Sequence, residues 1–338
     1  MRLPFHLPIL VAAFCAVAAR AEANVVLRVG PKAHYHTVAA AVAAADSDTD
    51  PAHYYVIKVA PGTYTNDFPS VTRAMTIEVD PARSGRAVIL KATQLLPNEK
   101  GIILNTANLT VDGLTFRGAK IADDLGGNGA GIRDQNLGSP ATLIVENSSF
   151  IDNQEGILTG NNASQSISII NSTFENNGNP NINHFQHGLY VNYAGSLTVT
   201  SSTFCGQLIG HDIKSRAMMT SISDNRLYDG EADPAIGCRA GSTSFAIDVA
   251  NGGVATISGN AIVQGPASQN YRMVDYGEEG LPYGTNTLLV SDNSFTNIGA
   301  NPAIAIYDPN CIRAQLAGNT FTGIATIVDP SNCIAQGN

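Results

Sequence analysis

Three of the chain's seven histidines fall between residues 184 and 216, close to two basic side chains. The segment reads HFQHGLY at 184–190 and GHDIKSR at 210–216. Lysine and arginine bind carboxylates, and arginine can do so through two parallel hydrogen bonds. A histidine or tyrosine beside such cations can transfer protons, because a neighbouring positive charge lowers its pKa. These residue types indicate acid–base chemistry on an anionic substrate, with the following catalytic candidates: His187, Tyr190, His211, Lys214 and Arg216.

Each candidate also has a purely structural interpretation. His187 can cap a strand corner by bonding a backbone carbonyl, and His211 has the phase of a buried residue. Lys214 and Arg216 can form ion pairs with neighbouring aspartates. Tyr190 can stack on a sugar without transferring a proton. The choice between these interpretations depends on the strands that carry the residues.

A repeated phrase supplies such strands. Seven segments, 23 to 35 residues apart, share period-two apolar residues, a small polar corner and a final apolar residue: LTVDGLTF (109–116), LIVENSSF (143–150), ISIINSTF (167–174), LTVTSSTF (197–204), TSISDNRL (220–227), ATISGNAI (255–262) and LLVSDNSF (288–295). This pattern and its irregular spacing are typical of the coils of a parallel β-helix. The final residues are expected to stack inside it: Phe116, Phe150, Phe174, Phe204, Leu227, Ile262 and Phe295.

A second set of short strands lies between these phrases. Its predicted interior residues are Ile132, Ile157, Leu189, Ile213, Ile247 and Ile304. Because side chains alternate along a strand, the following residues should point outward. That outward column is Arg133, Leu158, Tyr190, Lys214, Asp248 and Ala305, with Asn192 and Arg216 two residues further along their strands. Coils lie about 4.8 Å apart, so Tyr190, Lys214 and Asp248 are expected side by side.

The N-terminal region predicts a cap. VVLRVG (25–30) reads as a strand, HTVAAAVAAA (36–45) as an Ala-rich helix with Val38 and Val42 on one face, and YVIKVAPGTY (55–64) as a strand followed by a turn. Together with the repeats, this cap resembles the pectate-lyase-like (pectin lyase fold) superfamily over roughly residues 25–338. The resemblance implies an all-β, single-domain right-handed parallel β-helix with a short N-terminal capping helix.

Residues 1–23 are expected to be a signal peptide, with residues 24–338 forming the β-helix domain. Arg2 precedes the apolar run LPILVAAFCAVAA, which ends at a small-residue cleavage site. The run is shorter than the roughly 20 apolar residues of a membrane span. We therefore expect a secreted or periplasmic protein without a membrane span.

Four cysteines remain after the signal peptide: Cys205, Cys238, Cys311 and Cys333. In an exported chain they predict two disulfides rather than a metal site, and no C-x-x-C spacing supports zinc. Three connectivities are open. The pairs Cys205–Cys238 and Cys311–Cys333 are favoured because each would join neighbouring coils.

The net charge of −9 argues against nucleic acid, which requires a broad basic face. An acidic polysaccharide or oligosaccharide is the expected partner, met by a local basic cluster on a monomer. The acidic run Asp46, Asp48 and Asp50 starts like a calcium loop, but Pro51 replaces the required glycine and Ile57 the terminal glutamate. No metal or cofactor is expected, and no motif supports calcium.

The expected activity is inferred from the family resemblance and from the histidines, tyrosine and basic residues clustered between residues 184 and 216. The superfamily includes lyases, epimerases, pectinesterases and polygalacturonases, and the aspartate motifs of polygalacturonases and of calcium-dependent epimerases are missing from this chain. What remains looks most like a metal-independent polysaccharide lyase, in which Lys214 and Arg216 replace calcium. β-Elimination from a uronic-acid polymer needs a cation for the C5 carboxylate, a base for the C5 proton and an acid for the departing O4. His187, His211 and Tyr190 are the candidates for the proton transfers.

Further residues are expected to line the substrate groove: Arg133, Asn192, Asp248, Asn251 and Tyr276. The Gly-rich loop 273–286, which carries Glu278, Glu279 and Tyr283, could form one wall. A C5-epimerase and a glycoside hydrolase are alternatives, with Asp212, Asp248 or Asp275 as carboxylate donors for hydrolysis. A non-catalytic carbohydrate-binding solenoid is a third alternative.

Overall fold

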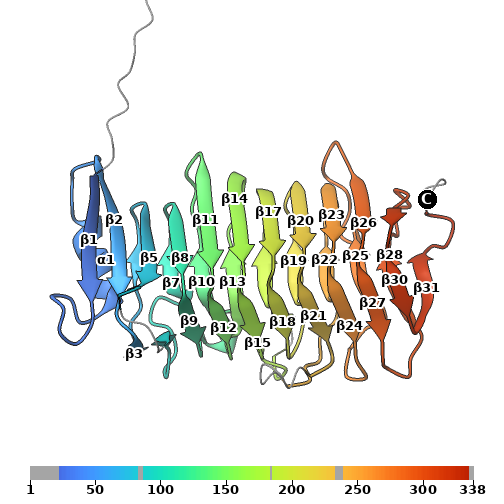
Figure 1. The fold of residues 1–338 in the computed structure, drawn as a ribbon, viewed down its shortest axis with the longest axis horizontal. Helices are drawn as coiled ribbons and strands as arrows, with labels where there is room; N and C mark the ends of the chain where they lie inside the picture. Colours follow the sequence, from blue (N-terminus) through green and yellow to red (C-terminus); the bar gives the residue numbers. More distant parts are fainter. Residues whose placement is uncertain (1–22, 83–86, 183–184, 233–238, 335–338) are drawn as a thin grey trace, which may run out of the picture.

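The chain folds as a right-handed parallel β-helix, as the repeats predicted (Figure 1). The computed structural model describes residues 23–82, 87–182, 185–232 and 239–334; the expected signal peptide therefore lies almost wholly outside the described residues. Three long parallel sheets of 11, 10 and 10 strands wind around one core. No helix in these ranges is long and apolar enough to cross a membrane.

Each coil contributes one strand to each sheet. Sheet 1 contains β1 (Ala23–Val29), β2 (His53–Val59), β5 (Met75–Val79), β8 (Leu109–Asp112), β11 (Ala141–Glu146), β14 (Asn162–Ile170), β17 (Ala194–Thr200), β20 (Met219–Ser223), β23 (Val254–Ser258), β26 (Thr287–Ser291) and β29 (Gln315–Ala317). Sheet 2 contains β3 (Gly62–Thr65), β6 (Val88–Lys91), β9 (Leu114–Arg117), β12 (Ser149–Ile151), β15 (Thr173–Glu175), β18 (Thr203–Cys205), β21 (Arg226–Asp229), β24 (Ala261–Gln264), β27 (Ser294–Asn297) and β30 (Thr320–Thr322). Sheet 3 contains β4 (Ser70–Val71), β7 (Gly101–Asn105), β10 (Ala130–Asp134), β13 (Glu155–Thr159), β16 (Leu189–Val191), β19 (Ile213–Ser215), β22 (Ile247–Val249), β25 (Arg272–Tyr276), β28 (Ala303–Tyr307) and β31 (Ile324–Asp329).

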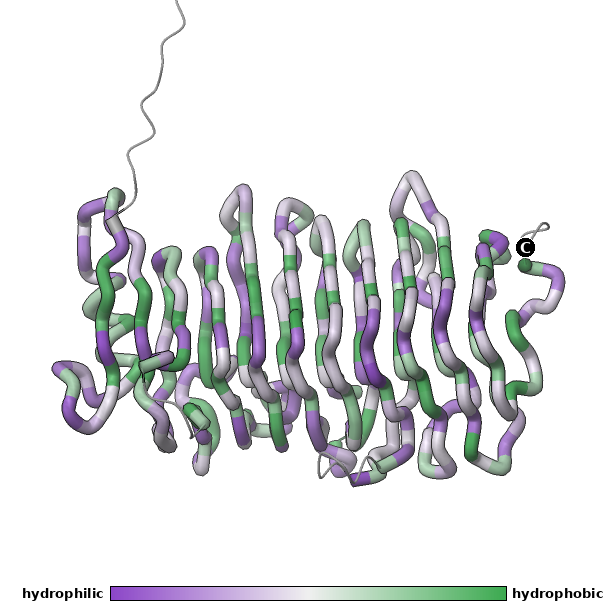
Figure 2. The backbone as a smooth tube through the Cα atoms, viewed as in Figure 1, coloured by the Kyte–Doolittle hydropathy of each residue, from purple (hydrophilic) through white to green (hydrophobic). Residues whose placement is uncertain are grey.

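The predicted ladder fills the interior behind sheet 2. The rings of Phe116, Phe150, Phe174 and Phe204 stack in sequence at centroid distances of 5.0, 4.8 and 4.4 Å. Leu227, Ile262 and Phe295 continue the same register, and all seven side chains are buried. Figure 2 shows the alternation of hydrophobic and hydrophilic residues that runs along every coil. Burial of one apolar column per sheet is what turns the repeated phrase into a solenoid.

The small polar corner of each phrase forms a second ladder between sheets 1 and 2. Each corner asparagine donates through Nδ2 to a strand carbonyl one coil earlier and accepts, through Oδ1, the preceding corner's backbone N–H. The residues of this ladder are Asn225, Asn260, Asn293 and Asn319, preceded by Ser148, Ser172 and Ser202. Buried backbone groups at the turn are thereby satisfied, which explains why the corner is polar.

The N-terminal cap is helix α1 (Val38–Asp46), close to the predicted range. Thr37 is its N-cap, and the carboxylate of Asp67 accepts the N–H groups of Val38 at 2.6 Å and Ala39 at 2.9 Å. Val38 and Val42 are buried, as their spacing predicted. The helix therefore packs its apolar face on the first coils.

One disulfide is as predicted: Cys311 is bonded to Cys333, with Cα atoms 4.8 Å apart. Cys205 is buried and disulfide-bonded, whereas its expected partner Cys238 lies outside the described residues. A disulfide is typical of proteins from oxidising compartments.

The outward column was wrong at its last position. Ala305 is fully buried, and Tyr307 pairs with Asp275 in the place predicted for it. The pairs Arg272–Ile304 and Val274–Ile306 show that the coil is shifted by two residues from the predicted register. Strict alternation fails because the residues just before the interior column, Ala246, Met273 and Ala305, are fully buried as well.

Candidate functional site

The clustered residues come together on the outer face of sheet 3. Strand register pairs Tyr190 with Lys214, Lys214 with Asp248, and Asp248 with Asp275 on successive coils. The column also runs back through Leu158, which is buried and contributes no polar group. β16, β19, β22 and β25, which lie next to one another in sheet 3 (Figure 1), therefore position the site.

A carboxylate is held between the two cations. Glu279 places Oε1 2.7 Å from Nζ of Lys214 and Oε2 2.5 Å from a guanidinium nitrogen of Arg216. Lys214 also contacts Oδ2 of Asp248 at 2.8 Å. Although burial would lower it, these two carboxylates raise the pKa of Lys214. Lys214 is therefore charged at neutral pH, and the two side chains are arranged to bind the two oxygens of one carboxylate.

Tyr190 lies beside this pair. Nζ of Lys214 is 5.8 Å, and the guanidinium carbon of Arg216 5.7 Å, from the centre of its ring. Burial raises the pKa of Tyr190, and the two cations only partly offset this. The phenol is consequently neutral at rest, with its ring packed against positive charge.

The two histidines stack on the neighbouring coils. Their ring centroids are 4.7 Å apart, and His211 stacks in turn on Phe245 at 4.9 Å. Nδ1 of His187 accepts the backbone N–H of His211 at 3.0 Å, and Nδ1 of His211 accepts that of Phe245 at 3.2 Å. A neutral imidazole that accepts through Nδ1 carries its proton on Nε2. Nε2 of His211 lies 3.3 Å from Asp248.

Both histidines are held neutral. Burial lowers the pKa of each well below its ordinary value, and Lys214 lowers both further. For His187 the neighbouring His211 and Arg216 act in the same direction. With Nδ1 committed to a backbone bond, His187 can donate its Nε2 proton but has no free lone pair for a base. His187 is therefore available to a ligand as a neutral hydrogen-bond donor through Nε2.

We expect His187→Asn to flatten the pH dependence of stability between pH 6.5 and 5.5. In this window the unfolded histidine gains a proton and the folded one does not, so the wild-type protein loses about 1 kcal/mol from this group as pH falls from 6.5 to 5.5. Asparagine keeps an acceptor near the position of Nδ1 but does not titrate. Urea unfolding at a series of pH values measures the two slopes, and equal slopes would show that His187 is protonated in the folded protein.

The two aspartates behind Lys214 form a coupled pair. Burial, followed by the adjacent Asp248, raises the pKa of Asp275 to about 9. Burial also raises the pKa of Asp248, although Lys214 opposes this. One proton and one charge are therefore shared at neutral pH, with the charge on Asp248 facing Lys214 and His211.

A buried carboxyl group, Glu155, lies on the coil before His187. Glu155 is buried, and its Oε2 accepts the backbone N–H of His187 at 2.8 Å. Burial raises the pKa of Glu155 well above its ordinary value, against the attraction of Arg133 and Lys214. Within the described residues, Nε and one terminal nitrogen of Arg133 are buried without a hydrogen-bond partner. Arg133 is partly buried at the edge of the cluster. Its two unpaired nitrogens are hydrogen-bond donors that a ligand can use.

Other predicted groove residues have structural contacts. Nδ2 of Asn192 donates to the carbonyl of Thr159 at 2.8 Å, and Nδ2 of Asn251 lies 3.4 Å from the carbonyl of Glu279. Tyr276 is fully buried, and its hydroxyl donates to the carbonyl of Gly253 at 2.5 Å. Its ring is therefore part of the core rather than a surface for a sugar, which corrects the expectation drawn from its position in a Gly-rich loop.

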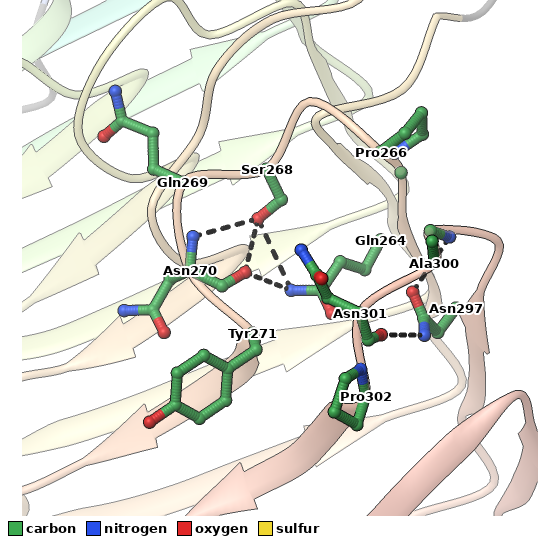
Figure 3. Close-up of a pocket in the computed structure, with 12 residues that line it drawn as sticks. Gln264, Pro266, Ser268, Gln269, Asn270, Tyr271, Asn297, Ala300, Asn301 and Pro302 are labelled. Carbon is green, nitrogen blue, oxygen red and sulfur yellow. Dashed lines mark hydrogen bonds between the residues drawn. The ribbon is translucent and has the colours of Figure 1, made fainter.

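A separate pocket of about 370 Å³ lies at the corners that precede β25 and β28 (Figure 3). Its lining residues include Gln264, Asn270, Tyr271, Asn297 and Asn301, and none of the residues that line it is a cation or a carboxylate. Internal bonds fix its floor, such as Gln264 Nε2 to the carbonyl of Asn270 at 2.8 Å. The pocket can meet hydroxyl groups but offers no partner for a substrate carboxylate, so the cluster on sheet 3 is the better candidate.

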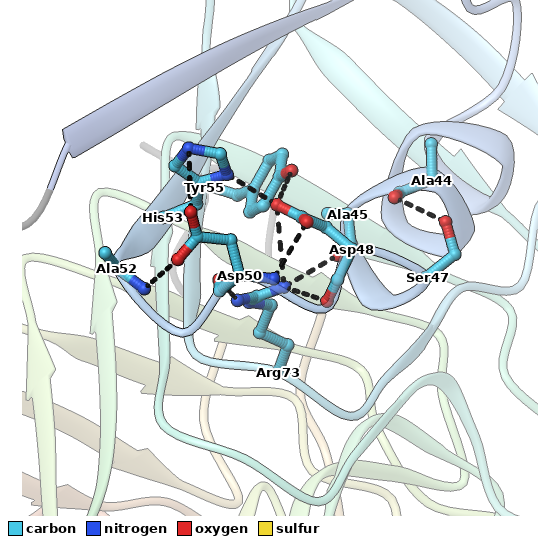
Figure 4. A network of polar contacts seen from close by, with 9 residues as sticks. All are labelled: Ala44, Ala45, Ser47, Asp48, Asp50, Ala52, His53, Tyr55 and Arg73. Atoms are coloured by element: carbon cyan, nitrogen blue, oxygen red, sulfur yellow. Dashed lines mark hydrogen bonds and ion pairs between the residues drawn. The ribbon is translucent and has the colours of Figure 1, made fainter.

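The acidic run near the N-terminus is engaged internally (Figure 4). Asp48 accepts from the hydroxyl of Tyr55 at 2.7 Å and contacts Nδ1 of His53 at 2.6 Å. Arg73 donates to the carbonyls of Asp48 and Asp50. Among the described residues, no group of three or more His, Cys, Asp or Glu side chains is arranged to hold a metal ion.

Two contacts were not apparent from the sequence. The loop with Glu279 was expected to form a wall, but its ion pairs with Lys214 and Arg216 join side chains 65 and 63 positions away, across two coils. The buried Glu155 was missed because it lies at a corner, where period two gives no phase. Comparisons of the chain with protein-family models, with curated proteins and with solved structures find no match.

Proposed function

We propose that the protein is an exported carbohydrate-active enzyme of the pectate-lyase-like superfamily that cleaves a uronic-acid polymer by metal-independent β-elimination. The single observation that supports this most is the clasp of Lys214 and Arg216 on both oxygens of a carboxylate. A uronate presents the same group at C5. Neutralising it acidifies the C5 proton and stabilises the enolate-like charge of the transition state.

The roles of the neighbouring residues follow from their protonation. Tyr190 removes the C5 proton as its phenolate, which is the minor form at rest and whose charge the two adjacent cations stabilise. The C4–O4 bond breaks as the C4=C5 double bond forms, and the departing O4 takes the proton that Tyr190 has removed from C5 while Nε2–H of His187 donates a hydrogen bond to it. Tyr190 and His187 are in edge-to-face contact at 5.0 Å between ring centroids, so both can face one sugar ring.

Asp248 and His211 position this apparatus. Asp248 holds Lys214 on the sheet face and contacts Nε2 of His211, and the backbone N–H of His211 fixes the tautomer of His187. Arg133, Asn192 and Asn251 lie around the cluster and are proposed substrate contacts. The Cys311–Cys333 disulfide supports an exported protein.

Product chemistry tests the proposal. The protein is incubated with polygalacturonate, alginate and glucuronan, and a conjugated C=C product is followed by its ultraviolet absorbance. We expect absorbance to rise with one of the polymers. New reducing ends without absorbance would show a hydrolase, and exchange of the C5 hydrogen with D₂O without chain cleavage would show an epimerase. Binding without any of these would show a carbohydrate-binding solenoid.

A further inference from the structure

We propose that Glu279 is a built-in substitute for the substrate carboxylate, so that the loop from Gly277 to Asn286 acts as a latch that a uronate must displace. This inference rests on the proposed function and concerns the regulation of the same site. The carboxylate of Glu279 already occupies both cations. A second carboxylate cannot take the same place until Glu279 leaves.

The loop is anchored beside the site at several points. It follows β25, and the backbone N–H of Glu279 donates to the carbonyl of Ala250 at 3.0 Å. The hydroxyl of Tyr283 donates to the carbonyl of Arg216, on the same residue whose guanidinium binds Glu279. At its far end, Oδ1 of Asn286 accepts the N–H of Gly253 at 2.8 Å. These bonds give the loop a defined closed position.

The same loop is loosely packed between its anchors. Gly277 is a fixed point, because Nδ2 of Asn310 donates to its carbonyl at 2.7 Å, whereas Gly280, with a φ of 103°, lies beyond it. A Cβ placed on Gly280 or Gly284 would meet no atom within 4 Å, so nothing packs against these two points of the loop. The side chain of Glu279 is 38% exposed, in contrast to 5% for Asp248. Glu279 is therefore the partner of Lys214 that can exchange with solvent.

When Glu279 is displaced, neither Lys214 nor Arg216 is left without an ion-pair partner. Lys214 keeps its 2.8 Å contact with the buried Asp248, and an arriving uronate supplies the carboxylate that Arg216 loses. Because one carboxylate replaces another, the net charge of the site is unchanged. The exchange therefore avoids the free-energy cost of leaving a buried cation unpaired. It also favours ligands that carry a carboxylate.

Binding of D-glucuronate to Glu279→Gln tests the latch, with Glu278→Gln as the matched control. Glu278 is the adjacent residue, and its nearest cation is Arg272 at 3.7 Å rather than the clasp. By calorimetric titration, Glu279→Gln should bind glucuronate at least about tenfold more tightly than wild-type protein, and Glu278→Gln should bind like wild type. Equal affinity in all three proteins, or no binding to any of them, would overturn the latch.

Hydrogen exchange gives a second readout that needs no substitution. If glucuronate displaces the loop, the amides of Glu279 and Gly280 should exchange faster in wild-type protein when the ligand is present. Unchanged or slower exchange would contradict displacement. Tighter binding by Glu279→Gln without an unsaturated product from any polymer would support the latch on a uronate-binding protein and reject the lyase function.

Discussion

Lys214→Met is expected to lower kcat/KM on the polyuronate substrate by at least about 100-fold, the scale observed when one preorganised charge-stabilising group is removed. Methionine has a similar length but cannot neutralise the substrate carboxylate. The same change should lower the free energy of unfolding by about 3 kcal/mol, because the buried Asp248 loses its cation. Initial rates of ultraviolet absorbance and urea unfolding measure the two effects.

A double variant separates these effects. Lys214→Met/Asp248→Asn removes both charges of the buried pair and should regain much of the stability without regaining turnover. Lys58→Met is the matched control, because Lys58 makes a more exposed ion pair with Glu78 at 3.2 Å. It should change stability by less than about 1 kcal/mol and leave the rate unchanged. If the double variant turns over substrate at the wild-type rate, Lys214 has no role in catalysis.

The fold was predictable because a parallel β-helix repeats one local pattern. The register that pairs Phe150 with Phe174 is set by a short phrase, and the same phrase recurs with its phase intact on every coil. Period two then places Tyr190, Lys214 and Asp248 on one face of the sheet, since a one-residue slip would turn all three towards the core. In this fold the periodicity of the sequence therefore determines the register of the sheets.

The remainder of the site depends on corners and loops, where alternation carries no information. His187 and His211 lie just before their strands, and their stacking follows from the turn between sheets 2 and 3 rather than from a pattern. The clasp by Glu279 depends on a loop that crosses two coils. The failure at Ala305 has the same origin. Local propensity does not determine how far a loop folds back over a sheet.

Asp212 shows how a corner position can reverse an interpretation based on sequence. It was a candidate partner for the catalytic cluster and a candidate donor for hydrolysis. In the structure it is buried, and within the described residues neither of its carboxylate oxygens has a hydrogen-bond partner. It occupies the place that Gly188 fills one coil earlier, where a Cβ would lie 3.4 Å from the ring of Phe204. The next ladder residue in register with Phe204 is the smaller Leu227.

Burial, followed by the nearby Asp229, raises the pKa of Asp212 well above its ordinary value. The folded protein therefore keeps a proton that the unfolded chain has lost above about pH 4, and stability from this group is lost as pH rises towards the folded pKa. Asp212→Asn removes this cost. We expect the variant to match wild type near pH 4 and to gain stability relative to it as pH rises to 7, at about 1.4 kcal/mol per pH unit while the buried acid stays protonated.

Urea unfolding at pH 4, 5.5 and 7 measures this difference, with Asp224→Asn as the control at an exposed position. The control should follow wild type at every pH. If Asp212→Asn is instead less stable than wild type at pH 7, the carboxylate of Asp212 is ionised and held by a cation, and the corner is a binding site rather than a buried acid. A gain in stability with unchanged turnover would show that Asp212 belongs to the packing of the coil, and that the chemistry is confined to the outer face of sheet 3.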